Sequence, residues 1–380
     1  MNMQDERGFA LPMAIFGMLI AAVIITGATF LGRQELRVAI ANSNGILALY
    51  LAERGLANTM VDWDAVVLST LPLWGDTTLT DTLDTGVVST EVTRVGSRIY
   101  VLEATSTVTK GGEVLSGASR RVGLVVRLFT ADIDPPAALT TRGITSVGGT
   151  AEVHGEDVDP AEWGGLCSFP AENKPGVLTD DAENVTTSGQ GELTGNPALE
   201  EDTTISNSTF TQFGEMSWDD LVALADLSLP AGTINGTGPA VVSGQCSTSV
   251  LTNWGDPLNP TAPCGSYFPL IYVNGDALIQ SGGVGQGVLL VEGDLDLRGG
   301  FVFYGAIIVQ GNFDTQGNGN RVFGGVLAGN ANFESQSVTG GSVIQNSTCA
   351  VSRAILNSSS LNRPRPLGIR SWVDLSSAMN

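Results

Sequence analysis

The most apolar part of the chain lies near its start. Residues 9–32 read FALPMAIFGMLIAAVIITGATFLG, a run of 24 residues without a charged side chain. At about 1.5 Å per residue a helix of this length spans roughly 36 Å, which exceeds the hydrocarbon thickness of a bilayer, about 30 Å. The pattern therefore predicts a membrane-spanning helix over 9–32, with Pro12 in its first turn, where a missing N–H costs little.

A removable secretory signal is the alternative interpretation, because residues 39–41 (Ala-Ile-Ala) offer a small-x-small cleavage site. The apolar run is longer than such signals, which usually have 7–15 apolar residues, and three charged residues between 33 and 37 separate it from the site. We therefore expect a retained anchor. Residues 34–60 contain no proline and many alanines, which extends the predicted helix to 9–60.

Between about residues 86 and 130 the chain has the pattern of β-strands. Residues 98–104 and 121–128 are rich in β-branched side chains, and Lys110-Gly111-Gly112 between them is typical of a turn. A small β region over 61–134, with an antiparallel sheet on the outer half of the helix, would bury the apolar faces of both. The prolines at 135 and 136 mark a boundary after it.

Toward the C-terminus, glycine recurs every 18 residues, at Gly275, Gly293, Gly311 and Gly329. Alternation of apolar and polar side chains within this longer period indicates a β-helix, in which each coil stacks on the next and glycine occupies corners with unusual backbone angles. The apolar columns predicted by this register are Val273, Val291, Val309 and Leu327; Ala277, Leu295, Phe313 and Ala331; and Ile279, Leu297, Thr315 and Phe333.

Residues 143–155 have the pattern of one earlier coil, so we expect a β-helix-like domain over 137–380 with a long insertion at about 157–267. The insertion is acidic, since residues 152–226 carry 17 acidic side chains against Lys174 alone. The predicted fold class is α+β, mainly β: a long N-terminal helix, a small antiparallel sheet and a C-terminal β-helix.

The whole chain has 18 basic and 39 acidic residues, a formal net charge of −21. Such a charge repels phosphate backbones, so nucleic-acid binding is excluded. The single histidine, His154, excludes multi-histidine zinc sites. Carboxylate pairs such as Asp294 with Asp296, or Asp296 with Asp314, could serve a glycosidase. Basic and aromatic side chains that would bind a sugar acid are sparse nearby, so we expect no enzyme.

Four cysteines follow the apolar run, and an exported location permits disulfides among them. Four cysteines allow three pairings. We favour a bond between Cys246 and Cys264 around Trp254, which leaves Cys167 to pair with Cys349. A metal site is the alternative, but no CxxC spacing is present.

Asp276 and Asp294 would lie one coil apart, about 4.8 Å, in a polar column with Asn312 and Asn330. Two carboxylates at that distance repel each other unless a cation bridges them, and calcium accepts carboxylate oxygens. The alternative is an outward ladder of turn-forming residues. We expect the ladder, with calcium as the candidate cofactor at Asp276 and Asp294 and no other metal.

The N-terminus resembles that of type IV prepilins, whose short leader ends in glycine before a phenylalanine and a hydrophobic helix; this chain reads ERG-FALPMAIF. Residues 49–56, LYLAERGL, resemble the AEAGL stretch of the PilX-type minor pilin family, with Glu53 in the place of its glutamate. The resemblance implies a leader at 1–8, cleavage between Gly8 and Phe9 by a prepilin peptidase, and methylation of Phe9. Major pilins carry a glutamate where this chain has Met13, which favours a minor or tip subunit.

These patterns together predict a minor pilin-like structural protein of a type IV pilus or a related secretion pseudopilus. Its single membrane pass would lie in the inner membrane and the bulk of the chain would be exported, at the pilus or cell surface. The partners implied are other pilins, the assembly machinery, the prepilin peptidase and a surface ligand for a β-helix used in adhesion or priming. The alternative is a permanently anchored envelope protein whose solenoid binds a polysaccharide or protein.

Overall fold

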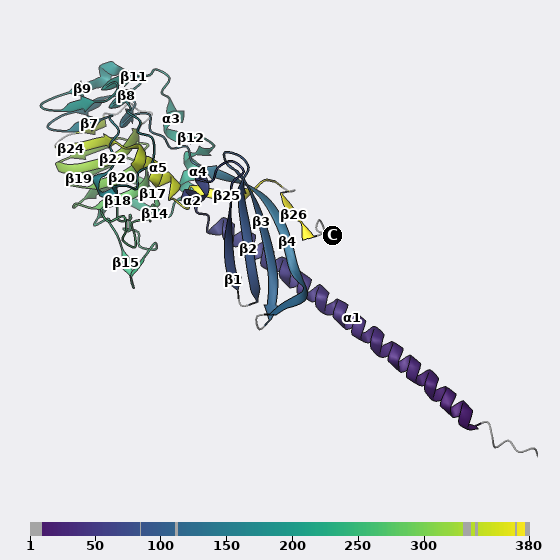
Figure 1. Cartoon of the computed structure of the whole chain (residues 1–380). Coiled ribbons are helices and arrows are strands. Elements are labelled where there is room, and N and C mark those ends of the chain that lie inside the picture. Colours follow the sequence, from purple (N-terminus) through teal and green to yellow (C-terminus); the bar gives the residue numbers. More distant parts are fainter. Residues whose placement is uncertain are drawn as a thin grey trace, which may run out of the picture. The chain divides into compact units, whose positions relative to one another are not determined.

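A computed structural model describes residues 10–83, 85–110, 113–329, 336–338, 341–368 and 371–376. The chain divides into two compact units. Unit 1 comprises residues 1–62, 71–127 and 366–380, and unit 2 comprises residues 63–70 and 128–365. The predicted fold class is confirmed: a long apolar helix and an antiparallel sheet precede a large curled sheet of parallel strands (Figure 1).

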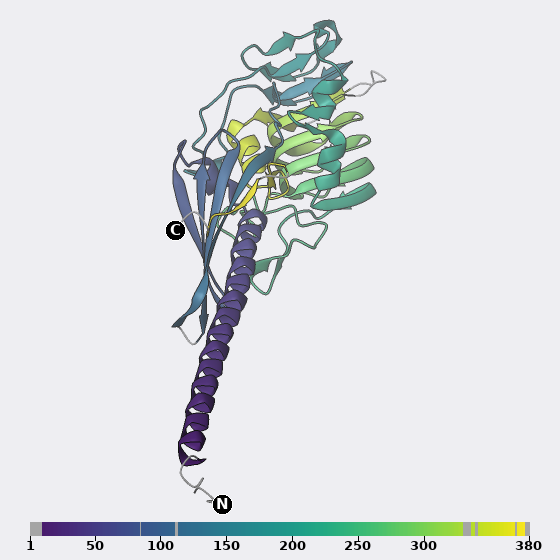
Figure 2. The same ribbon diagram turned by 90° about the vertical axis from the view of Figure 1, so that its right-hand side faces the viewer.

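Unit 1 consists of one long helix and an antiparallel sheet (Figure 2). The helix α1 covers Ala10–Val61, and its C-terminal half packs on β2 and β3. Residues 366–380 belong to this unit, because β26 (Trp372–Asp374) pairs with β4; they do not continue the β-helix as the range 137–380 had implied. The sheet order is β1 (Asp76–Leu83), β2 (Gly86–Arg94), β3 (Ile99–Lys110) and β4 (Glu113–Thr130).

Small side chains let α1 approach this sheet closely. Buried residues recur along the helix at spacings of three and four, which places them on one face. At Gly55 an added Cβ would lie 2.3 Å from Val88 Cγ1, so no larger residue fits without movement. The Ser106 hydroxyl donates a hydrogen bond of 2.6 Å to the carbonyl oxygen of Ala48, within this contact. The small residues of this face are Gly45, Ala48, Ala52, Gly55 and Thr59, and the larger Leu51 and Leu56 are buried beside them.

We expect Gly55→Ala to destabilise unit 1, with Gly32→Ala as the matched control because nothing lies within 4 Å of a Cβ at Gly32. Both substitutions gain the same helix propensity, about 1 kcal/mol, so the difference between them isolates the lost fit. Gly55→Ala should be less stable than Gly32→Ala by about 1–3 kcal/mol. Denaturant unfolding of the detergent-solubilised chain measures this, and equal stability of the two variants would contradict the close packing.

Unit 2 is a solenoid in which each coil presents strands on three faces. On one face Leu289 lies beside Ile307, Ile307 beside Val326, and Val326 beside Leu139. All of these neighbouring strands are parallel, as stacking of successive coils requires. The central coils contain β17 (Leu270–Gln280), β18 (Val284–Val291), β19 (Leu295–Arg298), β20 (Val302–Val309), β21 (Phe313–Gln316), β22 (Asn318–Ala328), β23 (Gln336–Val338) and β24 (Gly341–Asn346).

The order of the coils in space differs from their order in the sequence. Residues 139–154 do form a coil, but its strands pair with β22, β23 and β24 at the end of the repeat, and not with the beginning of the repeat at β17. The stack runs from 227 to 346 and then continues with 139 to 201. The strands of the N-terminal part are β5 (Leu139–Thr141), β6 (Thr145–Val147), β7 (Glu152–His154), β8 (Val177–Thr179), β9 (Val185–Thr187), β10 (Glu192–Thr194) and β11 (Leu199–Glu201).

This order corrects the interpretation of residues 157–267 as an insertion. Strands β8, β9 and β10 form a coil on top of β5, β6 and β7, and β11 pairs with β8 in turn. At the opposite end of the stack β14 (Leu227–Asn235) pairs with β17. The expected insertion therefore contains both ends of the solenoid, and the excursions from it are shorter: 155–176, 202–226 and 236–269.

The 18-residue register holds in the middle of the repeat and changes at its end. Ala277, Leu295 and Phe313 are in register as predicted. Val309 pairs with Ala328 and not with the predicted Leu327, because one extra residue enters between the two coils. Thr315 has Val338 as its neighbour where Phe333 was predicted. Ala331 and Phe333 themselves lie outside the described residues.

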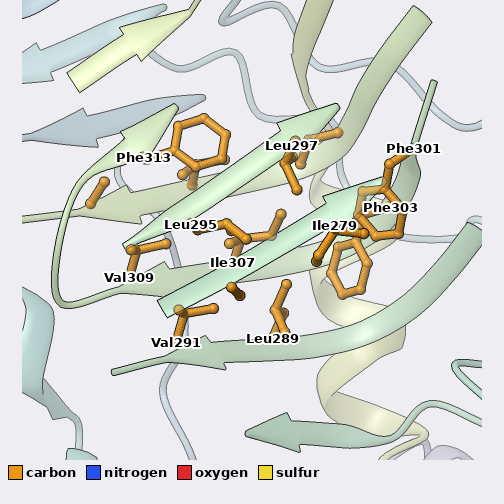
Figure 3. Packing of buried hydrophobic residues seen from close by; sticks show 14 of the residues in the cluster. Ile279, Leu289, Val291, Leu295, Leu297, Phe301, Phe303, Ile307, Val309 and Phe313 are labelled. Carbon is orange, nitrogen blue, oxygen red and sulfur yellow. The ribbon is translucent and has the colours of Figure 1, made fainter. Parts of the chain in front are cut away.

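Apolar side chains fill the interior of the coils and also cover one outer face. Figure 3 shows the interior layers, in which Val291, Leu295, Ile307 and Phe313 are fully buried. On the outside, a second cluster that includes Leu290 and Ile308 is covered by α5 (Thr348–Leu356) and neighbouring segments. Burial on both sides explains why β18 and β20 contain continuous apolar runs.

The remaining elements are short. They are α2 (Ala65–Ser69), η1 (Ala161–Trp163), η2 (Ala182–Asn184), α3 (Asn207–Thr211), β12 (Gln212–Phe213), β13 (Met216–Ser217), α4 (Trp218–Leu224), β15 (Val241–Val242), β16 (Gln245–Cys246) and β25 (Asn362–Pro366). The helix expected after Ser217 is α4, whose first turn is closed by a capping box between Ser217 and Asp220.

Candidate functional site

The N-terminal half of α1 is an apolar helix without a covering. All residues from Leu11 to Ile40 are exposed, including Pro12 and Met13, and the Met13 side chain is 60% exposed. By length and composition α1 could cross a membrane: its most apolar 18-residue window has a mean hydropathy of 2.3 and none of it is buried. A helix that is apolar all round requires a water-free environment, either lipid or the packed helices of other subunits.

The residues of the prepilin-like motifs fall in two places. Gly8 and Phe9 lie outside the described residues. The LYLAERGL stretch lies where α1 meets the sheet: Ala52, Gly55 and Leu56 are buried, whereas Glu53 is exposed. In this chain the small and apolar residues of the stretch therefore pack against the antiparallel sheet of unit 1, and the Glu53 side chain is at the surface.

The cysteines form two disulfides with different surroundings. Cys246 pairs with Cys264, 18 residues apart, and Cys167 pairs with Cys349, 182 residues apart. This is the pairing that the sequence favoured. Asp159 approaches the second pair closely enough to suggest a metal cluster, but the bonded sulfurs carry no thiolate to bind one.

The aspartates that repeat every 18 residues form a hydrogen-bonded ladder. Asp276 Oδ1 accepts from the backbone N–H of Asp294 at 2.9 Å, and Asp294 Oδ1 accepts from the N–H of Asn312 at 2.8 Å. An added Cβ at Gly293 would lie 2.1 Å from Asp276 Oδ1, and at Gly311 2.4 Å from Asp294 Oδ1. Space for the carboxylate therefore requires glycine at these two positions. A positive φ, which the sequence pattern suggested, occurs in this column at Gly275.

The other charged groups that were candidates for chemistry are engaged by neighbours. Asp296 forms an ion pair with Arg298, and this hydrogen bond raises the pKa of the Arg298 guanidinium. His154 Nδ1 lies 2.8 Å from the hydroxyl of Thr194, its neighbour on the next coil. That hydroxyl donates to Glu156 and lowers the pKa of the Glu156 carboxyl. The contacts of Thr194 join adjacent coils, whereas Asp296 and Arg298 belong to the same strand, β19.

Lys174, the one basic residue of the acidic segment 152–226, is buried. Its Nζ donates to Asp134 Oδ1 at 2.5 Å and to the carbonyl oxygen of Pro135 at 2.9 Å. A pocket of about 320 Å³ lies beside it, with Asp132, Asp134 and Glu172 on its wall. The lysine thus fixes the segment that leads into β5 to the coil that contains β8.

Sequence reasoning missed Trp163, which is 1% exposed and belongs to the outer cluster of unit 2. Its ring stacks on Tyr304 with a centroid distance of 5.3 Å and meets the edge of Phe268 at 5.9 Å. Its isolated position in a polar, acidic segment was the available signal, because a large aromatic residue in such a segment generally needs a buried partner.

Comparison with known proteins gives little further guidance. A scan against protein-family models found no match, and no curated protein matches the chain. Among solved structures the chain aligns with the competence-associated pilin ComZ from Thermus thermophilus at 11% identity, over 87% of this chain and 96% of that chain, with a TM-score of 0.24. A similarity of that size carries no argument about function.

We expect the aspartate ladder to be independent of calcium. Asp294→Asn keeps an oxygen acceptor for the Asn312 N–H, whereas Asp294→Ala removes it. The asparagine variant should unfold like the unchanged protein, and the alanine variant should lose about 0.5–1.5 kcal/mol. Thermal unfolding with calcium and with a chelator checks this. A drop in the melting temperature on chelation, together with asparagine and alanine variants that behave alike, would show a bound cation instead.

Proposed function

We propose that the chain is a minor pilin-like structural protein of a type IV pilus or a related pseudopilus, of the PilX type. Its α1 helix is held in the inner membrane before assembly and among the helices of other pilins afterwards. The solenoid is displayed outside, for adhesion or for priming of assembly. The partners in this proposal are the prepilin peptidase, other pilins, the assembly machinery and a surface ligand.

The two-part character of α1 is the observation that supports this proposal. Residues 11–40 are exposed and apolar over most of their length, and residues 45–59 carry the small side chains that pack on the sheet. The same helix thus provides an apolar segment for insertion into a membrane or filament and a second segment on which the antiparallel sheet packs. The same apolar surface suits lipid and a filament interior, since neither contains water.

Met13 supports a minor position in the filament. In the prepilin resemblance a glutamate at this position is thought to pair with the terminal amine of a neighbouring subunit. Met13 offers no charge for that contact, so a subunit with methionine there would be best placed where no such neighbour is needed, at a tip. The exported location that this assignment requires agrees with the two disulfides.

The mature N-terminus provides the test. Mass spectrometry of the protein from its native cells should find N-methylated Phe9 as the first residue, and Gly8→Val should abolish this cleavage. Gly17→Val, a control within the same apolar run, should be cleaved normally because nothing lies within 4 Å of a Cβ there. A chain that starts at Asn42 would indicate ordinary secretion, and an intact Met1 would indicate the permanently anchored envelope protein; either would contradict the proposal.

A further inference from the structure

Among the described residues, the stacked coils include one interface at which strands far apart in the sequence pair with each other. We call it the seam: the contact of β5, β6 and β7 with β22, β23 and β24. The seam joins the coils of residues 139–201 to the end of the coils of residues 227–346. Elsewhere in the described stack, neighbouring coils are consecutive along the chain. The inner core continues across the seam, where Leu139, Val147 and Val153 share one cluster with Val326 and Ile344.

A strap formed by residues 156–172 crosses from the coils of residues 139–201 (the first set) to the coils of residues 227–346 and α5 (the second set or second segment). It leaves β7 and returns to β8, and midway it inserts Trp163 against Tyr304 and Phe268, which belong to the second set. Trp163 Nε1 donates to the carbonyl oxygen of Pro257 at 2.8 Å, and the Arg353 guanidinium lies 4.9 Å above the ring. The strap therefore contacts several parts of the second segment.

Polar contacts fix both ends of the strap to the start of α5. The Asn346 side-chain amide donates to the carbonyl oxygen of Gly155 at 3.1 Å and to that of Glu172 at 2.9 Å. Asp157 Oδ1 accepts from the N–H of Thr348 at 2.8 Å. Between these contacts, the Cys167–Cys349 disulfide joins the strap covalently to α5.

The two disulfides consequently restrain different parts of unit 2. Cys246–Cys264 lies within the second segment and closes a short loop that holds the buried Asn253 and Trp254. Cys167–Cys349 crosses the seam and closes a loop of ten times that sequence separation, 182 against 18 residues. A cross-link between distant residues removes more freedom from the opened chain than a local one does.

We propose that the strap is a redox-operated latch: while Cys167–Cys349 is closed the seam stays shut, and reduction lets residues 139–201 open as a unit before the coils of 284–309 unfold. A dithiol reductant would act by attack of its thiolate on one sulfur of the bond, followed by displacement with its second thiol. Cys167 and Cys349 then gain two electrons and two protons, and the reductant becomes a disulfide. The half-buried Cys167 is the accessible sulfur, because Cys349 is 1% exposed.

The test uses the full chain in detergent and hydrogen exchange measured on peptides. In Cys246→Ser/Cys264→Ser the latch disulfide is the one that remains, so reductant acts on it alone. Reduction should speed exchange in 139–154 and 177–201 at least tenfold and leave 284–309 within twofold. Cys167→Ser/Cys349→Ser should show the fast exchange in 139–201 without reductant.

Three results would overturn the proposal. Exchange in 139–201 could be unchanged on reduction, which would mean that the seam needs no latch. Exchange could rise equally in 139–201 and 284–309, which would mean that the solenoid opens as a whole. If Cys246→Ser/Cys264→Ser does not fold, the unchanged chain and Cys167→Ser/Cys349→Ser are compared without reductant, and equal exchange in 139–201 would again reject the latch.

Discussion

Every coil of the solenoid must find backbone partners on the coil next to it, and this requirement governs the architecture of unit 2. Each strand segment leaves N–H and C=O groups on both edges that a buried position cannot leave unpaired. The last coil of the repeat, which ends with β24, meets this demand with β7 from much earlier in the chain. The path of the chain over 202–226, which returns to β14 at the far end, is a consequence of that closure.

The sequence predicts such a stack where the spacing is regular and fails where pairing is decided by contacts between distant segments. Leu295 and Phe313 are in register because the coil between them has neither an insertion nor a deletion. Val309 pairs with Ala328 because one extra residue between Gln316 and Arg321, where β22 begins, shifts the next coil by one position without changing the local alternation. The pairing of β6 with β23 cannot be predicted from the periodicity of the sequence, because any coil with a suitable apolar pattern would fit that edge.

For the long helix, too, the sequence pattern predicts one feature, the apolar run, and does not predict another, the face that packs on the sheet. The apolar run over 9–32 is recognised from composition alone, because a helix that crosses a membrane needs a run of this length and character. The large residues Ile40 and Leu47, which are the natural choice for a buried face, are 50% and 38% exposed. Close approach to the sheet places the small Gly55 and Ala48 on the buried face, beside the buried Leu51 and Leu56, so side-chain size alone does not mark that face. Gly8 and Phe9, the predicted cleavage site, lie outside the described residues.

Several charged groups on the solenoid are engaged by the chain's own backbone and side chains. Asp276 and Asp294 each accept from the backbone of the next coil, and Asp296 is paired with Arg298. A general acid or a nucleophile needs a carboxylate that is directed at a substrate and is not committed to the backbone. The same hydrogen bonds explain why the glycines recur, because Gly293 leaves room for the Asp276 carboxylate. The repeated aspartates, which resemble a binding motif in the sequence, therefore align one coil on the next.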